Sequence, residues 1–109
     1  MAPRVVDAAS FDAAVASSGD ELVVVDFHGP SCPNCEVFVA ALPDLLADLH
    51  DVRFTLLQCD AYANPSLAER FSLHGVPTFI LLRRGRVLGR MSGYRGRAFF
   101  TQVVREHAG

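Results

Sequence analysis

The sequence predicts one α/β domain in which helices cover both faces of a central mixed β-sheet. Its 109 residues, half of them hydrophobic, suffice for a single buried core. Strand-like apolar segments alternate with helical patterns, which is typical of parallel βαβ units. The last two strand-like segments flank Arg84-Gly85, a dipeptide that indicates a hairpin and therefore antiparallel strands. We expect the order β-α-β-α-β-α-β-β-α over residues 1–109.

The first half of the chain predicts two strands and two helices. Residues 3–6 form a short strand, and Ser10 is a candidate N-cap for a helix over 10–17. Residues 22–27 are almost all apolar, as expected of a central strand that is covered on both faces. A long helix follows over 32–50.

The long helix carries apolar residues at helical spacing. One inward stripe has the spacing i, i+4, i+7 and i+11 and consists of Phe38, Leu42, Leu45 and Leu49. A second apolar row covers more of the circumference and consists of Val37, Ala41 and Leu46. Pro43 should kink the helix, because proline lacks an N–H and crowds the preceding turn.

The second half predicts three strands and two helices. A strand covers 52–59, and Asn64 then caps a short helix over 65–71 that begins with proline. Strands over 78–83 and 86–91 form the hairpin. The last helix has one apolar face, made of Phe99, Phe100, Val103 and Val104.

The charge pattern argues against nucleic-acid binding. The net charge is −2 at pH 7. All ten basic residues are arginines, and seven of them fall within 83–109 beside a single acid, Glu106. We expect these arginines to form a solvated hairpin and helix surface, and a site for an anionic partner is the alternative.

Hydropathy and cysteine content bear on the compartment. No apolar segment approaches the roughly 18–20 residues that a spanning helix needs, and the first residues contain no apolar signal region. Three cysteines, an odd number, do not fit the disulfide framework of a secreted protein. We therefore expect a cytoplasmic protein that does not act at a membrane.

Cys32-Pro33-Asn34-Cys35 lies between the apolar strand and the long helix. Two thiols at i and i+3 on a first helical turn are close enough to form and break a disulfide. The unsatisfied N–H groups of the helix point at the leading sulfur and favour its thiolate. A zinc site is the alternative, but zinc normally takes four ligands, and no second paired motif accompanies Cys59 and the four histidines. We expect redox chemistry and no metal.

Asp26 places a carboxylate inside a strand that is otherwise apolar. Desolvation disfavours the charged form, so burial should raise the pKa of this carboxyl group. A solvated position at a sheet edge is the alternative.

A series of short motifs extends over almost the whole chain. They are Val25-Asp26-Phe27, the CxxC at 32–35, Asp60, Asn64-Pro65, Gly75-Val76-Pro77-Thr78, Arg84-Gly85 and Gly93. In their order and spacing the chain resembles the thioredoxin family. The resemblance implies the thioredoxin fold and thiol–disulfide oxidoreductase activity on protein disulfides, with no bound cofactor.

The resemblance also implies roles for individual residues. Cys32 is the exposed nucleophile of low pKa, and Cys35 resolves the mixed disulfide that Cys32 forms. Asp26 lies behind the two sulfurs and accepts a proton from Cys35. We expect a monomer that is recycled by a thioredoxin reductase using NADPH.

A substrate groove follows from the same resemblance. Pro77 is expected to be cis and to face the disulfide, while the backbone of Val76 pairs with the substrate chain. Gly93 and Tyr94 line the far side, where glycine lets a partner backbone approach closely. The expected substrate-binding residues are Pro33, Asn34, Gly75, Val76, Pro77, Thr78 and Gly93.

The chain departs from the family at the active site. Ser31 stands where thioredoxins carry a tryptophan, and Pro33-Asn34 replaces Gly-Pro between the cysteines. The intervening pair tunes the redox potential, so a potential more oxidising than that of thioredoxin is a reasonable expectation. These changes bear on the partners more than on the chemistry.

Two further residues each allow two interpretations. His28 replaces a usual aromatic residue; protonated it would favour the Cys32 thiolate, and neutral it is only a spacer. Cys59 is expected to be a buried, inert thiol, with a regulatory or intermolecular disulfide as the alternative.

Two other functions compete with the reductase hypothesis. Pro33 suggests glutathione-linked exchange of the glutaredoxin type, although a full β-α unit before the active-site strand is the thioredoxin arrangement. A non-catalytic adaptor would keep the fold and bind a partner through the groove or the arginines. The presence together of Cys32, Cys35, Asp26 and Pro77 argues against the adaptor.

Overall fold

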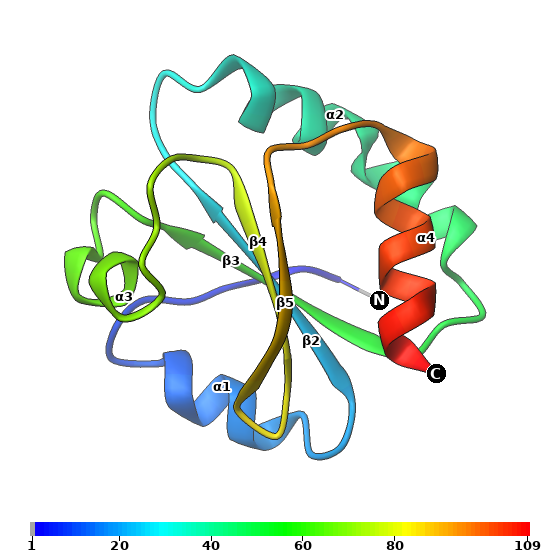
Figure 1. Ribbon diagram of the computed structural model, residues 1–109, viewed down its shortest axis with the longest axis horizontal. Coiled ribbons are helices and arrows are strands. Elements are labelled where there is room, and N and C mark those ends of the chain that lie inside the picture. The colour runs from blue at the N-terminus through cyan, green and yellow to red at the C-terminus, as the bar shows by residue number, and fades with distance from the viewer. Residues whose placement is uncertain (1) are drawn as a thin grey trace.

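A five-stranded mixed sheet lies between two helical layers in the computed structural model, which describes residues 2–109 (Figure 1). The strands are β1 Arg4–Val5, β2 Leu22–His28, β3 Phe54–Asp60, β4 Thr78–Arg83 and β5 Arg86–Ser92. Their order in the sheet is β1-β3-β2-β4-β5. β1, β3 and β2 are mutually parallel, whereas β4 is antiparallel to both β2 and β5. The expected fold class and element order are confirmed.

The four helices divide between the two faces of the sheet. They are α1 Phe11–Ser17, α2 Pro33–Asp48, α3 Pro65–Arg70 and α4 Arg97–Ala108. α1 and α3 lie on one side in Figure 1, and α2 and α4 lie on the other. β2, α2 and β3 form a strand–helix–strand unit with parallel strands. Such units favour a right-handed crossover.

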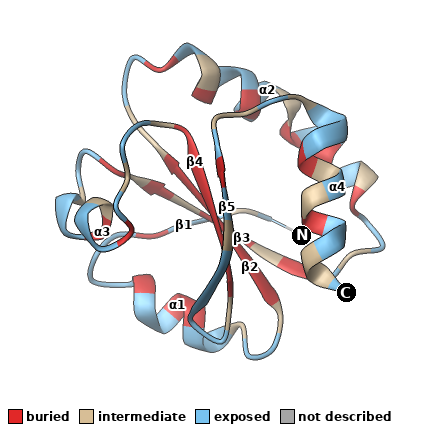
Figure 2. Ribbon diagram, viewed as in Figure 1, coloured by how far each residue is buried: buried red, intermediate tan, exposed pale blue. Residues whose placement is uncertain are grey.

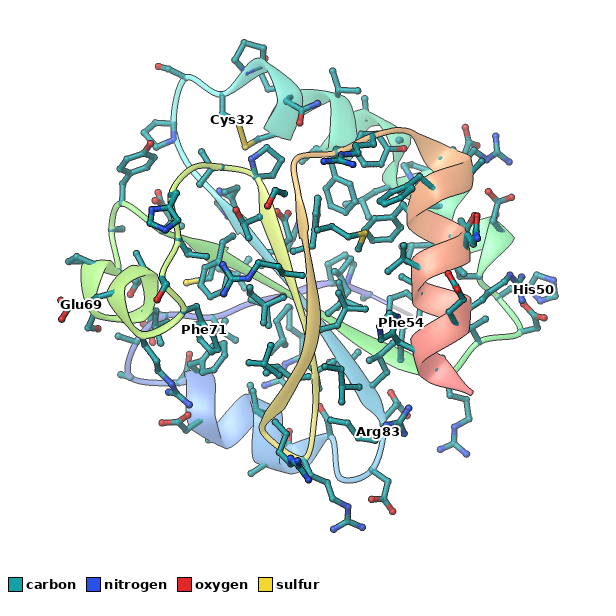
Figure 3. The ribbon with its side chains drawn as sticks, in the orientation of Figure 1. Cys32, His50, Phe54, Glu69, Phe71 and Arg83 are labelled. Atoms are coloured by element: carbon teal, nitrogen blue, oxygen red, sulfur yellow. A yellow bond between two sulfur atoms is a disulfide. The ribbon has the colours of Figure 1, made fainter. Side chains whose placement is uncertain are left out.

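Two hydrophobic cores separate the helices from the sheet. Buried residues concentrate on the central strands and on the inward sides of the helices (Figure 2). Phe71 belongs to the core under α1 and α3, while Phe54 belongs to the core under α2 and α4 (both labelled in Figure 3). From Leu22 to Phe27 every residue of β2 is buried, as expected of a central strand.

The hairpin between β4 and β5 turns through Arg84 and Gly85. Both residues have positive φ, 51° and 77°. Two successive positive φ angles are typical of a type I′ turn, whose twist matches that of the flanking strands. The predicted hairpin is therefore confirmed at the predicted residues.

The buried faces of α2 and α4 contain fewer apolar residues than the sequence suggested. Val37 in α2 is 54% exposed, and Phe99 in α4 is 40% exposed. Each helix rests on the sheet along one stripe, Phe38-Leu42-Leu45 in α2 and Phe100-Val104 in α4. Pro43 lies inside α2, which continues to Asp48.

The side chains of the two predicted N-cap residues, Ser10 and Asn64, do not bind the helices that they precede. The Ser10 hydroxyl accepts a hydrogen bond from the Asp7 N–H (3.0 Å), and the Asp7 carboxylate accepts one from the Ser10 N–H (2.9 Å). Asn64 occupies the N-cap position of α3, but its side chain accepts from the Ala8 N–H and donates to the Asp60 carbonyl. Neither polar side chain caps its own helix, because a backbone partner outside the helix takes up its hydrogen bonds.

Most of the arginines near the C-terminus are bound within the molecule. Arg83 donates to the carbonyls of Asp20 and His107, both at 2.7 Å, and Arg90 donates to the carbonyl of Phe71 at 2.7 Å. Three others form ion pairs with acids from earlier elements: Arg84 with Asp20, Arg97 with Asp48 and Arg105 with Asp51. The three ion pairs offset part of the basic charge, and all of these contacts join distant parts of the chain.

We predict that Leu45→Ala destabilises the protein far more than Val37→Ala, although both lie in α2. Leu45 is fully buried, so its truncation should lower the free energy of unfolding by about 2–5 kcal/mol. Val37 is largely exposed, and alanine favours helix, so its replacement should be nearly neutral. Urea denaturation measures both, and equal losses would contradict the assignment of one buried stripe.

Candidate active site

The two active-site cysteines lie at the N-terminus of α2, beyond the end of β2 (Figure 3, where Cys32 is labelled). Cys32 and Cys35 are joined in a disulfide. Their exposed fractions are 9% and 7%. The expectation of an exposed Cys32 is therefore wrong for the disulfide form, in which only a small part of this residue reaches solvent.

The first turn of α2 directs a backbone donor at the leading sulfur. Cys32 is the N-cap residue, with extended backbone (φ −117°, ψ 97°), and the Cys35 N–H donates to its Sγ at 3.1 Å. Pro33 occupies a first-turn position where a missing N–H does no harm. The sulfur thus takes the place of a capping oxygen, and the positive end of the helix dipole favours negative charge there.

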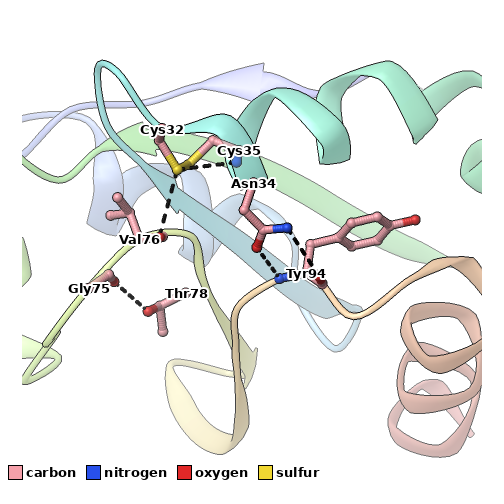
Figure 4. Close-up of a disulfide and its surroundings, with 7 residues drawn as sticks. All are labelled: Cys32, Asn34, Cys35, Gly75, Val76, Thr78 and Tyr94. Carbon is pink, nitrogen blue, oxygen red and sulfur yellow. Dashed lines mark hydrogen bonds between the residues drawn. A yellow bond between two sulfur atoms is a disulfide. The ribbon is translucent and has the colours of Figure 1, made fainter.

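The segment before β4 faces the disulfide. The Val76–Pro77 peptide bond is cis, as expected. The Val76 carbonyl oxygen lies 3.7 Å from Cys32 Sγ (Figure 4). Because the sulfur of a disulfide carries no proton, this is a contact that becomes a candidate hydrogen bond only in the dithiol. The Thr78 hydroxyl donates to the Gly75 carbonyl at 2.7 Å and holds the loop closed.

A hollow of about 290 Å³ lies beside this segment, between it and the end of β5. Five of the expected substrate-binding residues line it: Gly75, Val76, Pro77, Thr78 and Gly93. Gly93 has φ 86°, a conformation that glycine adopts without strain, and its N–H donates to the Pro77 carbonyl at 2.8 Å. The structure therefore brings these five together, whereas Pro33 is exposed on the helix and does not line the hollow.

Asn34 reaches across to the loop between β5 and α4 (Figure 4). Its Oδ1 accepts from the Tyr94 N–H at 2.8 Å, and its Nδ2 donates to the Tyr94 carbonyl at 3.2 Å. Sequence reasoning placed Asn34 in the groove but missed this double contact. Nothing in the local pattern around Asn34 indicates that the two segments meet.

Asp26 is buried on the face of the sheet that carries α2, with an exposed fraction of 1%. Its Oδ1 has no hydrogen-bond partner among the described residues. Burial raises the pKa of Asp26 from the ordinary 3.8 to about 6, while the charge of His28 and the side chain of Gln58 oppose part of this shift. The predicted burial of this carboxylate is confirmed, and a solvated position at a sheet edge is excluded.

Gln58 is a neighbour of Asp26 that sequence reasoning missed. The parallel pairing of β2 with β3 sets Asp26 opposite Gln58, so both side chains lie on the α2 side of the sheet. Gln58 and Thr55 are both polar residues inside β3, so the sequence alone gave no reason to single out Gln58. The register between the strands was needed to pair it with Asp26.

A second hollow, of about 660 Å³, opens on the other side of the disulfide. Its lining is mainly apolar and includes Pro30, Val39 and Ala40 together with both cysteines. His28 and Gln58 also line it. His28 follows Asp26 by two residues in β2, so the two side chains share a face of the strand. Solvent therefore reaches the neighbours of Asp26 from this side.

Cys59 lies away from the disulfide. It is fully buried in the core under α1 and α3, on the face of the sheet opposite Asp26. Desolvation raises the pKa of the Cys59 thiol to about 11, with Asp60 and Asp7 adding to the shift. This environment supports the interpretation as an inert core thiol.

Neither a metal-binding cluster nor a membrane-spanning helix is found among residues 2–109. No group of three or more His, Cys, Asp or Glu side chains there has the geometry to hold a metal ion. None of the helices in that range is long and apolar enough to cross a bilayer.

Comparisons with known proteins agree with this geometry. The family model described as Thioredoxin matches residues 2–106. The chain is 30% identical over 105 residues to a thioredoxin of Chlamydia pneumoniae, covering 96% of this chain and 98% of that protein. It is also 30% identical over 107 residues to a thioredoxin of Staphylococcus aureus, covering 98% and 99%.

Solved structures support the fold. The crystal structure of thioredoxin f2 from Chlamydomonas reinhardtii superposes with a TM-score of 0.85 at 22% identity, covering 97% of this chain and 96% of that one. Fasciola hepatica thioredoxin gives a TM-score of 0.83 at 23% identity, covering 95% and 98%. The matched family model, the full-length relatives and the CxxC disulfide together show that the chain belongs to the thioredoxin family of protein-disulfide oxidoreductases.

Proposed function

We propose that this chain reduces protein disulfides with Cys32 as nucleophile, Cys35 as resolving thiol and Asp26 as proton acceptor. The observation that carries the proposal is the hydrogen bond from the Cys35 N–H to Cys32 Sγ at the N-terminus of α2. A backbone donor aimed at a sulfur stabilises the thiolate, and the thiolate is the form that attacks a disulfide.

The first step forms a mixed disulfide. The Cys32 thiolate attacks one sulfur of the substrate disulfide, the substrate S–S bond breaks, and the other substrate sulfur leaves as a thiolate. The groove of Gly75 to Thr78 with Gly93 would hold the substrate chain beside Cys32, since the backbone of Val76, in the loop before β4, lies next to the sulfur.

The second step releases the reduced substrate. Cys35 loses its proton to Asp26, and its thiolate attacks Cys32 Sγ. The mixed disulfide breaks, the second substrate thiolate leaves, and the Cys32–Cys35 disulfide of the present structure results. The substrate gains two electrons and the protein dithiol loses two. A carboxyl group with a pKa of about 6 can accept the proton and return it near neutral pH.

His28 would adjust the proton transfer. It shares a strand face with Asp26 and lines the second hollow with both cysteines. A positive charge on His28 opposes the rise of the Asp26 pKa and favours a nearby thiolate. His28 would therefore act on Asp26 as well as on Cys32, whereas the sequence suggested an effect on Cys32 alone.

The setting of the reaction is also a proposal. A single domain over 1–109, acting as a cytoplasmic monomer, would receive electrons from NADPH through a thioredoxin reductase. Two observations support this setting: three cysteines in the chain, and full-length likeness to bacterial thioredoxins. The Pro33-Asn34 dipeptide would set its redox potential and partners apart from those of relatives that carry Gly-Pro.

The roles of the cysteines predict different adducts from two variants. Cys35→Ser should accumulate a mixed disulfide with insulin through Cys32, because nothing resolves it. Cys32→Ser should give no adduct, and Cys59→Ser should behave as the wild type because that thiol is buried. Intact-mass spectrometry after quenching with acid measures the adducts. An adduct on Cys32→Ser would reverse the assignment.

Replacement of the buried carboxylate should slow the chemistry. Asp26→Asn should reduce the rate of the resolution step at least about tenfold at pH 7, because Cys35 loses its base. Stopped-flow release of a substrate thiol measures this rate, and an unchanged rate would remove Asp26 from the mechanism.

The same variant should change how stability depends on pH. The folded pKa of Asp26 is raised from 3.8 to about 6, so ionisation destabilises the native state, by about 3 kcal/mol when complete. The destabilisation is absent below about pH 4, grows up to about pH 6 and is constant above it. Asp26→Asn should therefore gain stability over wild type across that window in urea denaturation, and parallel curves would contradict the raised pKa.

The proposed electron donor, a thioredoxin reductase, leads to a prediction about which coupled assay reduces insulin. Insulin reduction should proceed with NADPH and thioredoxin reductase and be much slower with NADPH, glutathione and glutathione reductase. Turbidity of the insulin B chain measures both rates. Faster reduction by glutathione would favour glutaredoxin-like exchange, and no reduction in either assay would favour the adaptor.

A further inference from the structure

The amide of Asn34 makes a two-point contact with one backbone residue. Oδ1 accepts from the Tyr94 N–H and Nδ2 donates to the Tyr94 carbonyl, at 2.8 and 3.2 Å (Figure 4). The side chain thus pairs with Tyr94 as a neighbouring strand would. Because both hydrogen bonds must be aligned at once, the contact fixes orientation as well as distance.

Both ends of this contact are anchored. Asn34 sits between the two active-site cysteines on the first turn of α2. The ring of Tyr94 packs against Phe38 and Phe100, with centroids 5.3 and 6.2 Å away. Tyr94 therefore joins the core under α2 and α4, and the loop that carries it is not free to follow the cysteine turn.

The Asn34–Tyr94 contact is part of a chain of contacts that leads back to the disulfide. From Tyr94 the chain passes back to Gly93, whose N–H donates to the Pro77 carbonyl at 2.8 Å. Pro77 follows Val76, whose carbonyl lies 3.7 Å from Cys32 Sγ. The cysteine turn is thereby connected to both loops of the groove.

We propose that Asn34 is a positioning residue that clamps the cysteine turn to the β5–α4 loop and favours the disulfide over the dithiol. Reduction replaces a covalent S–S bond by two sulfurs in non-bonded contact, so the turn must expand. A turn bound at two points to an anchored loop resists that expansion. The clamp also engages the N–H and C=O of Tyr94, which leaves the Val76 side of the groove for pairing with a substrate backbone.

This inference rests on the reversible Cys32–Cys35 couple of the proposed function, and its test needs no partner protein. Two glutathione molecules supply the electrons: their thiols become one glutathione disulfide while the protein disulfide becomes a dithiol. The equilibrium constant is measured in glutathione buffers by acid quenching, alkylation and mass spectrometry. Wild type is compared with Asn34→Ala and with Asn34→Leu, which keeps the branching at Cγ but can form neither hydrogen bond.

Asn64→Ala is the matched control. Asn64 also bridges two backbone segments, by accepting from the Ala8 N–H at 2.8 Å and donating to the Asp60 carbonyl at 3.0 Å, but its contacts lie outside the groove. Its loss should lower stability as the loss of Asn34 does, and leave the redox equilibrium unchanged. A purely structural role for Asn34 would give the same result as the control.

The expected result is a shift of about three- to tenfold towards the dithiol in both Asn34 variants, since two hydrogen bonds of ordinary strength are weakened on reduction. A tenfold shift corresponds to about 30 mV. Amide hydrogen exchange at Tyr94 in the oxidised protein should become faster in the same variants. Unchanged equilibria, shifts towards the disulfide, or equal shifts in Asn64→Ala would overturn the clamp. Failure of the wild-type couple to equilibrate would instead overturn the proposed function.

Discussion

The burial of β2 on both faces is the constraint on which the rest of the structure depends. This strand pairs in parallel with β3 and antiparallel with β4, and helices cover it from both sides. Its apolar side chains supply both cores, and its C-terminal end leads to the cysteine turn of α2. Because a strand in this position cannot shift by one residue without moving every side chain to the opposite face, it holds Asp26 on the α2 side with little freedom to move.

That rigidity explains why a buried carboxylate without a partner for one oxygen is tolerated. Burying Asp26 costs free energy, because its charged form loses water, and the packing of the apolar residues around it offsets this cost. The same desolvation raises the pKa of Asp26. A more mobile strand would let the carboxylate reach water and return to its ordinary pKa. Ionisation of Asp26 thus reduces stability at the residue that we propose as the proton acceptor, where a group that is neutral or charged with similar ease is useful.

The disulfide is surrounded by segments that are far apart in the sequence. The Val76 carbonyl and the Gly93 loop approach it from one side, and His28 and Gln58 line the hollow on the other. Asn34 connects the cysteine turn to Tyr94. The cysteine turn is therefore held by contacts from several distant parts of the chain, and the Asn34 side chain makes two of them.

Periodicity, turn residues and the CxxC spacing by themselves determined the order of the elements and the position of the central strand. They also determined the hairpin at Arg84-Gly85 and the dithiol at the start of α2. Each of these features depends on local backbone preferences or on spacing along one element. The same patterns indicated the buried Asp26, since a strand that is apolar on both faces leaves its one acid little access to water. Only the tertiary structure decided that Val37 and Phe99 face solvent, that Gln58 lies opposite Asp26 and that Asn34 binds Tyr94. Those facts follow from strand register and from the docking of helices and loops, where residues distant in sequence compete for the same neighbours.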